Sequence, residues 1–195
     1  MLLVRLPVRI LLCLITLILQ WVVNENRCAI MPPMFRDDYI VRTIQQAAAV
    51  LARILGLNDS ERYAEALQQV DAALQQFTGL NLGLVSGLSA PDLIEFARVG
   101  ETLDVGKLVV LGELLYAEGE IHRAQGQPTD AWGCYVRALE LLLEVAETGD
   151  HNLAAVAPRL ADLKTHLADA ELDPTLREWW GHVDARLDAL PPTAH

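Results

Sequence analysis

The sequence predicts an all-α fold, and three observations support that class. From about residue 34 onward, apolar residues recur at three- and four-residue steps, which is the period of one face of an α-helix. No segment shows the sustained alternation of apolar and polar residues that is typical of a strand. The segment 115–139, LYAEGEIHRAQGQPTDAWGCYVRAL, has the composition of two helices joined by a tight turn. We therefore expect antiparallel helical hairpins.

Small and rigid residues in this segment stand where a helical hairpin needs them. Gly119 lets the second helix approach closely because it has no Cβ. Gly126 is placed to end the first helix, and Pro128 fits the first turn of the second. The residues that we expect to define the packed face are Leu115, Gly119, Gly126, Ala131, Tyr135 and Ala138.

This spacing is that of a tetratricopeptide repeat, a helical hairpin of about 34 residues. Gly119, Ala131 and Tyr135 occupy three of its pattern positions, whereas its Leu and its closing Pro are absent. A weaker copy of the second-helix pattern, ERYAEALQQVDAAL at 61–74, lies roughly two repeat lengths earlier. We predict a short, irregular, right-handed tetratricopeptide-like stack.

Caps and breakers place the helices before the hairpin. We expect one helix over 36–55, ended by Gly56, and a second that is capped by the polar residues 58–60 and runs to about residue 77. The glycine- and leucine-rich segment 78–91 is predicted to be an apolar loop without a helix. A capping box at 89–92, Ser-Ala-Pro-Asp, starts a short helix to residue 98.

The remaining helices follow in the same way. Asp104 is placed to cap the first helix of the hairpin, which ends near Gln125. The second helix of the hairpin is expected over 129–148, before a glycine. Two more helices are expected over 152–168 and 174–190.

Composition limits the partners. A chain of 195 residues suits one domain with a sizeable core. It has 15 Lys and Arg against 26 Asp and Glu, which gives a net charge of -11. Such an acidic surface repels nucleic acid, so we expect no nucleic-acid partner.

The N-terminal residues allow three interpretations. Arg5 and Arg9 precede the apolar run ILLCLITLIL at 10–19, as in a signal peptide or a membrane anchor. A single-pass anchor would use residues 10–23, and a membrane partner is expected only if this segment is retained. In the interpretation that we favour, the gene start is over-long and the natural protein begins at Met34. The chain then divides into an extension (1–33), a helical domain (34–190) and a disordered tail (191–195).

Several stretches resemble a family of uncharacterised bacterial proteins with tetratricopeptide-like folds, whose members begin like MFRDDYIVR at Met34. The resemblance covers most of residues 34–190 and implies an all-helical, repeat-like fold and a natural start at Met34. It implies no activity, and therefore no catalytic residue. The stretches that carry it are 34–42, 61–74, 88–96 and 103–144.

No pattern in the chain indicates catalysis. A phosphate-binding loop, a paired Cys-x-x-Cys motif and a nucleophile elbow are all missing from the sequence. Glu118 and His122, like Asp162 and His166, stand four residues apart, whereas helical-bundle metal sites use a spacing of three. We therefore expect no enzyme, no metal and no cofactor.

The functional hypothesis concerns the first helix of the hairpin. Glu113, Tyr116, Glu120 and Arg123 form one stripe beside its packed row, at the i, i+3, i+7 and i+10 positions. In tetratricopeptide hairpins this helix lines the concave face, so the stripe is a candidate for binding a peptide with basic and apolar groups. The other interpretation of the stripe is an ordinary solvated face.

Three classes of function follow. The first is a cytoplasmic, non-catalytic interaction module or scaffold with an unknown protein or peptide partner. The second is the same scaffold tethered to a membrane through residues 10–23. The third is a small helical enzyme or metal protein. The sequence leaves open whether the residues of this stripe also form the contact of a homo-oligomer.

Overall fold

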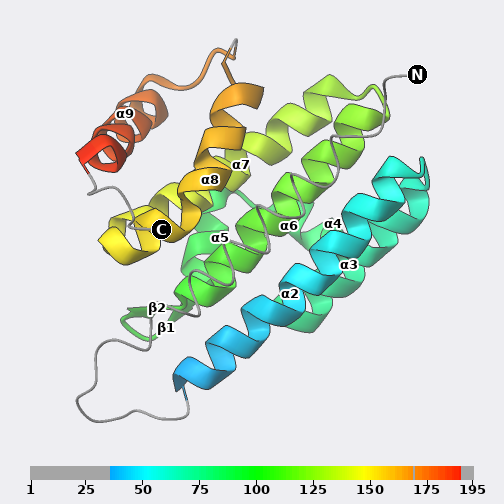
Figure 1. The fold of residues 1–195 in the computed structure, drawn as a ribbon, viewed down its shortest axis with the longest axis horizontal. Coiled ribbons are helices and arrows are strands. Elements are labelled where there is room, and N and C mark those ends of the chain that lie inside the picture. Colours follow the sequence, from blue (N-terminus) through cyan, green and yellow to red (C-terminus); the bar gives the residue numbers. More distant parts are fainter. Residues whose placement is uncertain (1–35, 169, 190–195) are drawn as a thin grey trace, which may run out of the picture.

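The computed structural model describes residues 36–168 and 170–189, and over these residues the chain is all-helical (Figure 1). This confirms the predicted all-α class. The predictions for the extension 1–33 and the tail 191–195 lie outside the described residues. The elements are α2 (Arg36–Asp59), α3 (Tyr63–Thr78), α4 (Leu82–Gly87), α5 (Ala90–Phe96), β1 (Arg98–Val99), β2 (Thr102–Leu103), α6 (Val105–Ala124), α7 (Pro128–Glu147), α8 (Asp150–His166) and α9 (Pro174–Ala189).

Helix α6 is the centre of the molecule (Figure 1). It packs against α2 and α3 on one side and makes its most extensive contact with α7. Helix α7 in turn contacts α5, α8 and α9. The turn between α6 and α7 is as expected, with Gly126 at a φ of +73° and Pro128 in the first turn of α7.

Two glycines allow α6 and α7 to pack closely. A Cβ on Gly119 would lie 2.6 Å from Cε1 of Tyr135, and one on Gly112 would lie 2.8 Å from Cδ2 of Leu142. The predicted close approach at Gly119 is therefore confirmed. The group that fills the space is an aromatic ring of the neighbouring helix.

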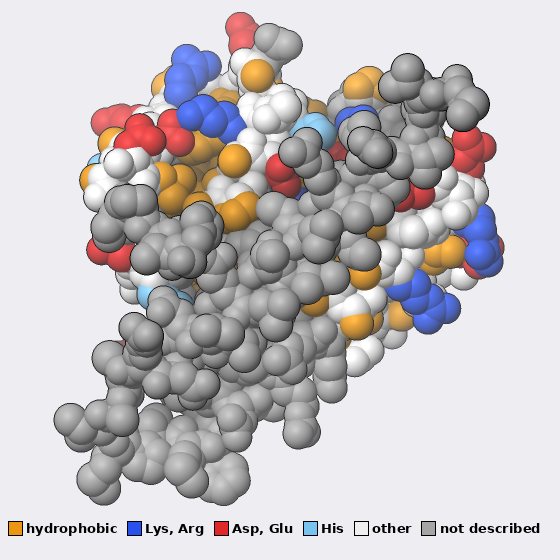
Figure 2. Space-filling view, viewed as in Figure 1, with side chains coloured by type: hydrophobic (Ala, Val, Ile, Leu, Met, Phe, Trp, Pro, Cys, Tyr) orange, Lys and Arg blue, Asp and Glu red, His pale blue; other side chains and the backbone are white. Residues whose placement is uncertain are grey.

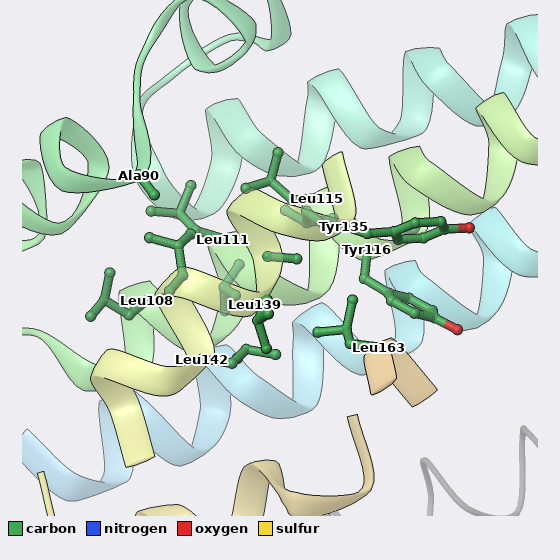
Figure 3. Packing of buried hydrophobic residues seen from close by; sticks show 14 of the residues in the cluster. Ala90, Leu108, Leu111, Leu115, Tyr116, Tyr135, Leu139, Leu142 and Leu163 are labelled. Carbon is green, nitrogen blue, oxygen red and sulfur yellow. The ribbon is translucent and has the colours of Figure 1, made fainter. Parts of the chain in front are cut away.

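The core is one hydrophobic cluster rich in leucine (Figure 3). Leu111 and Leu115 of α6 meet Leu139 and Leu142 of α7, and all four are at most 1% exposed. Because α6 has neighbours on several sides, its buried residues extend around much of its circumference. The packed positions predicted on α7 (Ala131, Tyr135 and Ala138) are all buried.

The predicted junction between the first two helices is wrong. Helix α2 continues through Gly56 and ends at Asp59, where Glu61 adopts a left-handed φ of +57°. The N–H groups of Glu61 and Arg62 donate to the carbonyls of Asn58 and Leu57, each at 2.9 Å. These bonds satisfy the last carbonyls of α2, so the polar residues 58–60 close α2 instead of capping α3.

The segment 78–91 also differs from its prediction as a loop. It contains the short helix α4, whose N-cap Asn81 accepts a hydrogen bond from the Leu84 N–H at 2.9 Å. Asp71 of α3 accepts from the Leu82 N–H at 2.6 Å and so holds the start of α4. Glycine lowers the helix propensity of this segment, but these two side chains supply the missing partners.

A two-residue antiparallel hairpin, β1 with β2, was also not expected; it pairs Arg98 with Leu103. The predicted caps are confirmed elsewhere. Ser89 forms the capping box with Asp92, and Asp104 accepts from the Lys107 N–H at 3.0 Å. The later helices begin and end within two residues of the predicted bounds.

Candidate functional site: a recess over helix α6

The four residues of the predicted stripe share one side of α6, but helix α8 covers much of it. Tyr116 is buried, at 8% exposed. The side chains of Glu113 and Glu120 are 16% and 14% exposed, and only that of Arg123 is well exposed, at 55%. The stripe is therefore largely a contact surface for a neighbouring helix.

Arg159 of α8 forms the centre of this contact. Its Nε and Nη2 donate to the Glu113 carboxylate at 3.0 and 2.7 Å, and its Nη1 donates to Asp162 at 2.8 Å. The guanidinium carbon lies 3.9 Å from the centroid of the Tyr116 ring. Burial alone would lower the pKa of Arg159, but the charge of Glu113 and its hydrogen bonds raise it above its ordinary value.

Glu120 joins three elements on the same side of α6. Its carboxylate accepts hydrogen bonds from Tyr135 Oη at 2.5 Å and from Arg123 Nη2 at 2.8 Å, and its Oε1 lies 3.3 Å from His166 Nε2. Burial alone would raise the pKa of Glu120, but the hydrogen bonds from Arg123 and Tyr135 bring it below its ordinary value. The carboxylate is thus held in its charged form.

Two tyrosines and a histidine form a ring cluster beside Glu120. The Tyr135 ring stacks on His166 with centroids 4.7 Å apart, and Tyr116 Oη lies 3.2 Å from His166 Nε2. Figure 3 shows both tyrosine rings extending to the same side of the leucine cluster. Burial is the main cause that raises the pKa of each tyrosine, so both hydroxyls stay protonated and act as hydrogen-bonding groups.

A small recess opens between these polar groups and helix α2. Its volume is about 30 Å³, enough for about one water molecule or a small side-chain group. Figure 2 shows one face of the molecule, and on its coloured part acidic and basic side chains lie close to one another without gathering by sign. The recess is lined by Leu51, Leu55, Glu113, Tyr116, Ala117, Glu120 and Arg159.

The sequence did not point to Arg159 of α8. Arg159 stands among Val156, Leu160 and Leu163, which are buried at helical spacing. A charged residue at such an apolar position was the available signal, because a buried charge requires a partner. Its partner Glu113 lies 46 residues away, so no local pattern could identify the pair.

The structure brings the members of one acid–histidine pair together, whereas those of the other pair have different partners. In α6, His122 Nε2 lies 3.6 Å from Glu118 Oε1, and the thiol of Cys134 from α7 joins them within 4.8 Å. Burial raises the pKa of Glu118, and it raises the pKa of Cys134 to about 12. Asp162 and His166, by contrast, use separate partners, Arg159 and Glu120.

Comparisons with known proteins add no family. No protein-family profile matches the chain, and neither a curated protein nor a solved structure shows significant similarity to it. The resemblance to a bacterial tetratricopeptide-like family therefore stays a prediction. Among the described residues, no helix combines the length and the apolar character needed to cross a membrane.

Proposed function

We propose that the protein is a non-catalytic helical scaffold that binds a partner protein or peptide over helix α6. In this proposal the pairs α2 with α3, α6 with α7 and α8 with α9 form a short tetratricopeptide-like stack. The contacts of α6 with both α2 and α3 support it, since each repeat of such a stack packs against the neighbouring repeat. Helices α2, α6 and α8 then line the binding side.

The recess is the observation that carries the proposal. One wall is apolar, from Leu51 and Leu55 of α2, and the other consists of Tyr116 and charged groups that are already held in place. Such preorganised groups lose little conformational entropy when a ligand binds. The recess therefore fits one small apolar side-chain group of a peptide that lies across α6.

Charge indicates the neighbouring group of that peptide. The chain carries a net charge of -11, and the Asp162 carboxylate beside Arg159 has a side chain that is 52% exposed. A basic group of a partner can approach this carboxylate without losing all of its hydration. We propose a partner peptide with Lys or Arg close to an apolar residue.

A random-peptide display library, selected on the purified full chain, tests this proposal. We expect enrichment of peptides that combine basic and apolar residues, and weaker binding of those peptides to Leu55→Ala and Asp162→Asn. Leu67→Ala is the matched control, because Leu67 is a partly buried leucine of α3 that does not line the recess. Its peptide binding should equal that of the wild type.

Two results would refute the binding proposal. One is a selection without enrichment, and the other is a set of peptides that bind all the variants equally. Sedimentation of the wild type over a range of concentrations tests a second copy of the chain as the occupant. A dimer that Leu55→Ala abolishes and Leu67→Ala retains would replace the peptide by that copy.

Localisation is part of the same proposal. A cytoplasmic scaffold is consistent with Cys134, which is free and buried. The alternative is a scaffold tethered through residues 10–23. Carbonate extraction of host membranes separates them, because a tethered chain stays with the membrane pellet.

A further inference from the structure

A second cluster of polar side chains lies between α6 and α7, and none of its members lines the recess. Glu118 and His122 of α6 and Cys134 of α7 offer a carboxylate oxygen, an imidazole nitrogen and a sulfur, all within 4.8 Å of one another. Glu118 and Cys134 are buried, and the His122 side chain is 19% exposed. Three different ligand types converge here from two helices.

Glu118 is the most unusual member of this cluster. Its side chain is only 5% exposed, and its Oε2 has no hydrogen-bond partner among the described residues. A buried carboxylate oxygen without a partner is costly, because it has lost its hydration without gaining a donor. A group that supplies positive charge to this oxygen would remove that cost.

The orientation of His122 supplies the second observation. Its Nδ1 lies 2.7 Å from Gln127 Oε1, and an amide oxygen only accepts, so Nδ1 carries the hydrogen. In the neutral ring, Nε2 then presents its lone pair toward Glu118 Oε1, 3.6 Å away. Two electron-pair donors face each other at this separation. A hydrogen bond from the second ring nitrogen to a protein acceptor is also what commonly orients a histidine that binds a metal.

The separation suits a shared ion. Zinc–oxygen and zinc–nitrogen bonds of about 2.0–2.2 Å in tetrahedral geometry place the two ligand atoms about 3.3–3.5 Å apart. The sulfur lies within 4.8 Å of the other two ligand atoms. It requires a shift of about 1.2 Å at most, since a zinc–sulfur bond of about 2.3 Å places it about 3.6 Å from them. Arg137 Nη2, 3.7 Å from Sγ, donates to the sulfur and helps to hold it beside Glu118.

We propose that Glu118, His122 and Cys134 form a binding site for one Zn²⁺ ion. A carboxylate and a thiolate supply two negative charges toward the ion, beside the single positive charge of Arg137, and the sulfur and imidazole ligands disfavour Mg²⁺ and Ca²⁺. The His122 side chain is 19% exposed, so solvent reaches this side of the cluster. A water molecule or a ligand from a partner would occupy the fourth coordination position of the ion. The ion would also link α6 to α7 independently of the recess over α6.

Zinc titration of the chelator-treated full chain, followed by calorimetry, tests the site directly. We expect one ion per chain and a higher melting temperature with zinc than without it. Loading with Co²⁺ should give a thiolate-to-cobalt charge-transfer band. Cys134→Ala should remove this band, and Cys134→Ala and Glu118→Gln should each weaken zinc binding by about 100-fold or more, since even outer-shell changes cost 10–100-fold.

Control variants distinguish zinc binding at this site from binding by other cysteines and histidines of the chain. The double variant Cys13→Ser with Cys28→Ser and the exposed-histidine variant His182→Ala should keep both the band and the affinity. Gln127→Ala should weaken zinc binding by about 10–100-fold without removing a ligand, because Gln127 only positions His122. Circular dichroism of each metal-free variant checks that it is folded.

Three outcomes would overturn the proposal. The first is the absence of stoichiometric zinc binding by the folded wild type. The second is a charge-transfer band that persists in folded Cys134→Ala. The third is loss of the band in the Cys13 and Cys28 double variant, which would assign the sulfur ligand to the other cysteines. Peptide selection at the recess is unaffected by any of these outcomes, so the two proposals can fail separately.

Discussion

Replacing Gly119 by alanine should destabilise the α6–α7 contact. The new Cβ would lie 2.6 Å from Cε1 and 2.8 Å from Cδ1 of the Tyr135 ring. The ring cannot move freely, because its hydroxyl donates to Glu120 and its face stacks on His166. The side chains must therefore shift together, or the two helices must separate.

The expected magnitude combines two opposing effects. Overpacking a core costs about 1–3 kcal/mol, and this rigid site belongs in the upper half of that range. Alanine gains about 0.5–1 kcal/mol over glycine in a helix interior. The free energy of unfolding should fall by about 1–2.5 kcal/mol in total, and the melting temperature by about 2–10 °C for a domain of this size.

Urea and thermal unfolding followed by circular dichroism measure this change, and two other glycines calibrate it. Gly133 of α7 has nothing within 4 Å of an added Cβ, so Gly133→Ala should stabilise the protein by about 0.5–1 kcal/mol. At Gly112 an added Cβ would lie 2.8 Å from Cδ2 and 2.9 Å from Cγ of Leu142, slightly farther than the closest approach at Gly119, so Gly112→Ala should fall between the other two.

The ranking of these three variants by stability tests whether the close approach at Gly119 determines the packing of α6 and α7. If Gly119→Ala is as stable as Gly133→Ala, the close approach does not determine the packing of the two helices. A double-mutant cycle with Tyr135→Ala adds a second criterion, because removing the ring should remove most of the cost of Gly119→Ala. A coupling energy near zero would also refute the argument.

Further predictions concern charges and caps. Arg159→Met should lower the free energy of unfolding by about 3 kcal/mol in urea titrations, because it leaves Glu113 largely buried without its partner. Arg62→Ala breaks an ion pair with Glu65 whose side chains are 55% and 52% exposed, so it should cost much less; similar losses in the two variants would contradict this. Ser89→Ala should cost about 1 kcal/mol by loss of the α5 cap, measured in the same way, and a neutral result would show that the cap is not needed. The pKa of Glu120 is lowered in the folded protein, so its contribution is complete above the unfolded value of about 4.3 and is lost as the pH falls through the folded value. Unfolding at a series of acidic pH values should therefore show a steeper loss of stability for the wild type than for Glu120→Gln, and parallel curves would contradict this assignment.

Much of the fold follows from patterns that act over a few residues. The capping box at Ser89, the cap at Asp104 and the turn at Gly126 each satisfy local backbone groups, and each is where the sequence places it. Local signals also produced the wrong prediction for the end of the first helix. Gly56 looked like a helix end, but α2 continues for three more residues and closes at the left-handed Glu61 instead. The choice depends on which carbonyls find donors, and a glycine alone does not settle it.

The site shows the limit of one-dimensional patterns more clearly. Spacing alone put Glu113, Tyr116, Glu120 and Arg123 on one side of α6, and they do share that side. It did not indicate that α8 would cover three of them.

The sequence by itself determined most of the helices, the turn of the central hairpin and the glycine that Tyr135 packs against, because period and caps are local properties of the chain. Tertiary structure alone decided what the polar side of α6 contacts. The Glu113–Arg159 pair spans 46 residues, and the grouping of Glu118 and His122 with Cys134 depends on how two helices cross. Hydrophobic periodicity shows which side of a helix is buried, but it does not show which polar groups a neighbouring helix brings to the other sides.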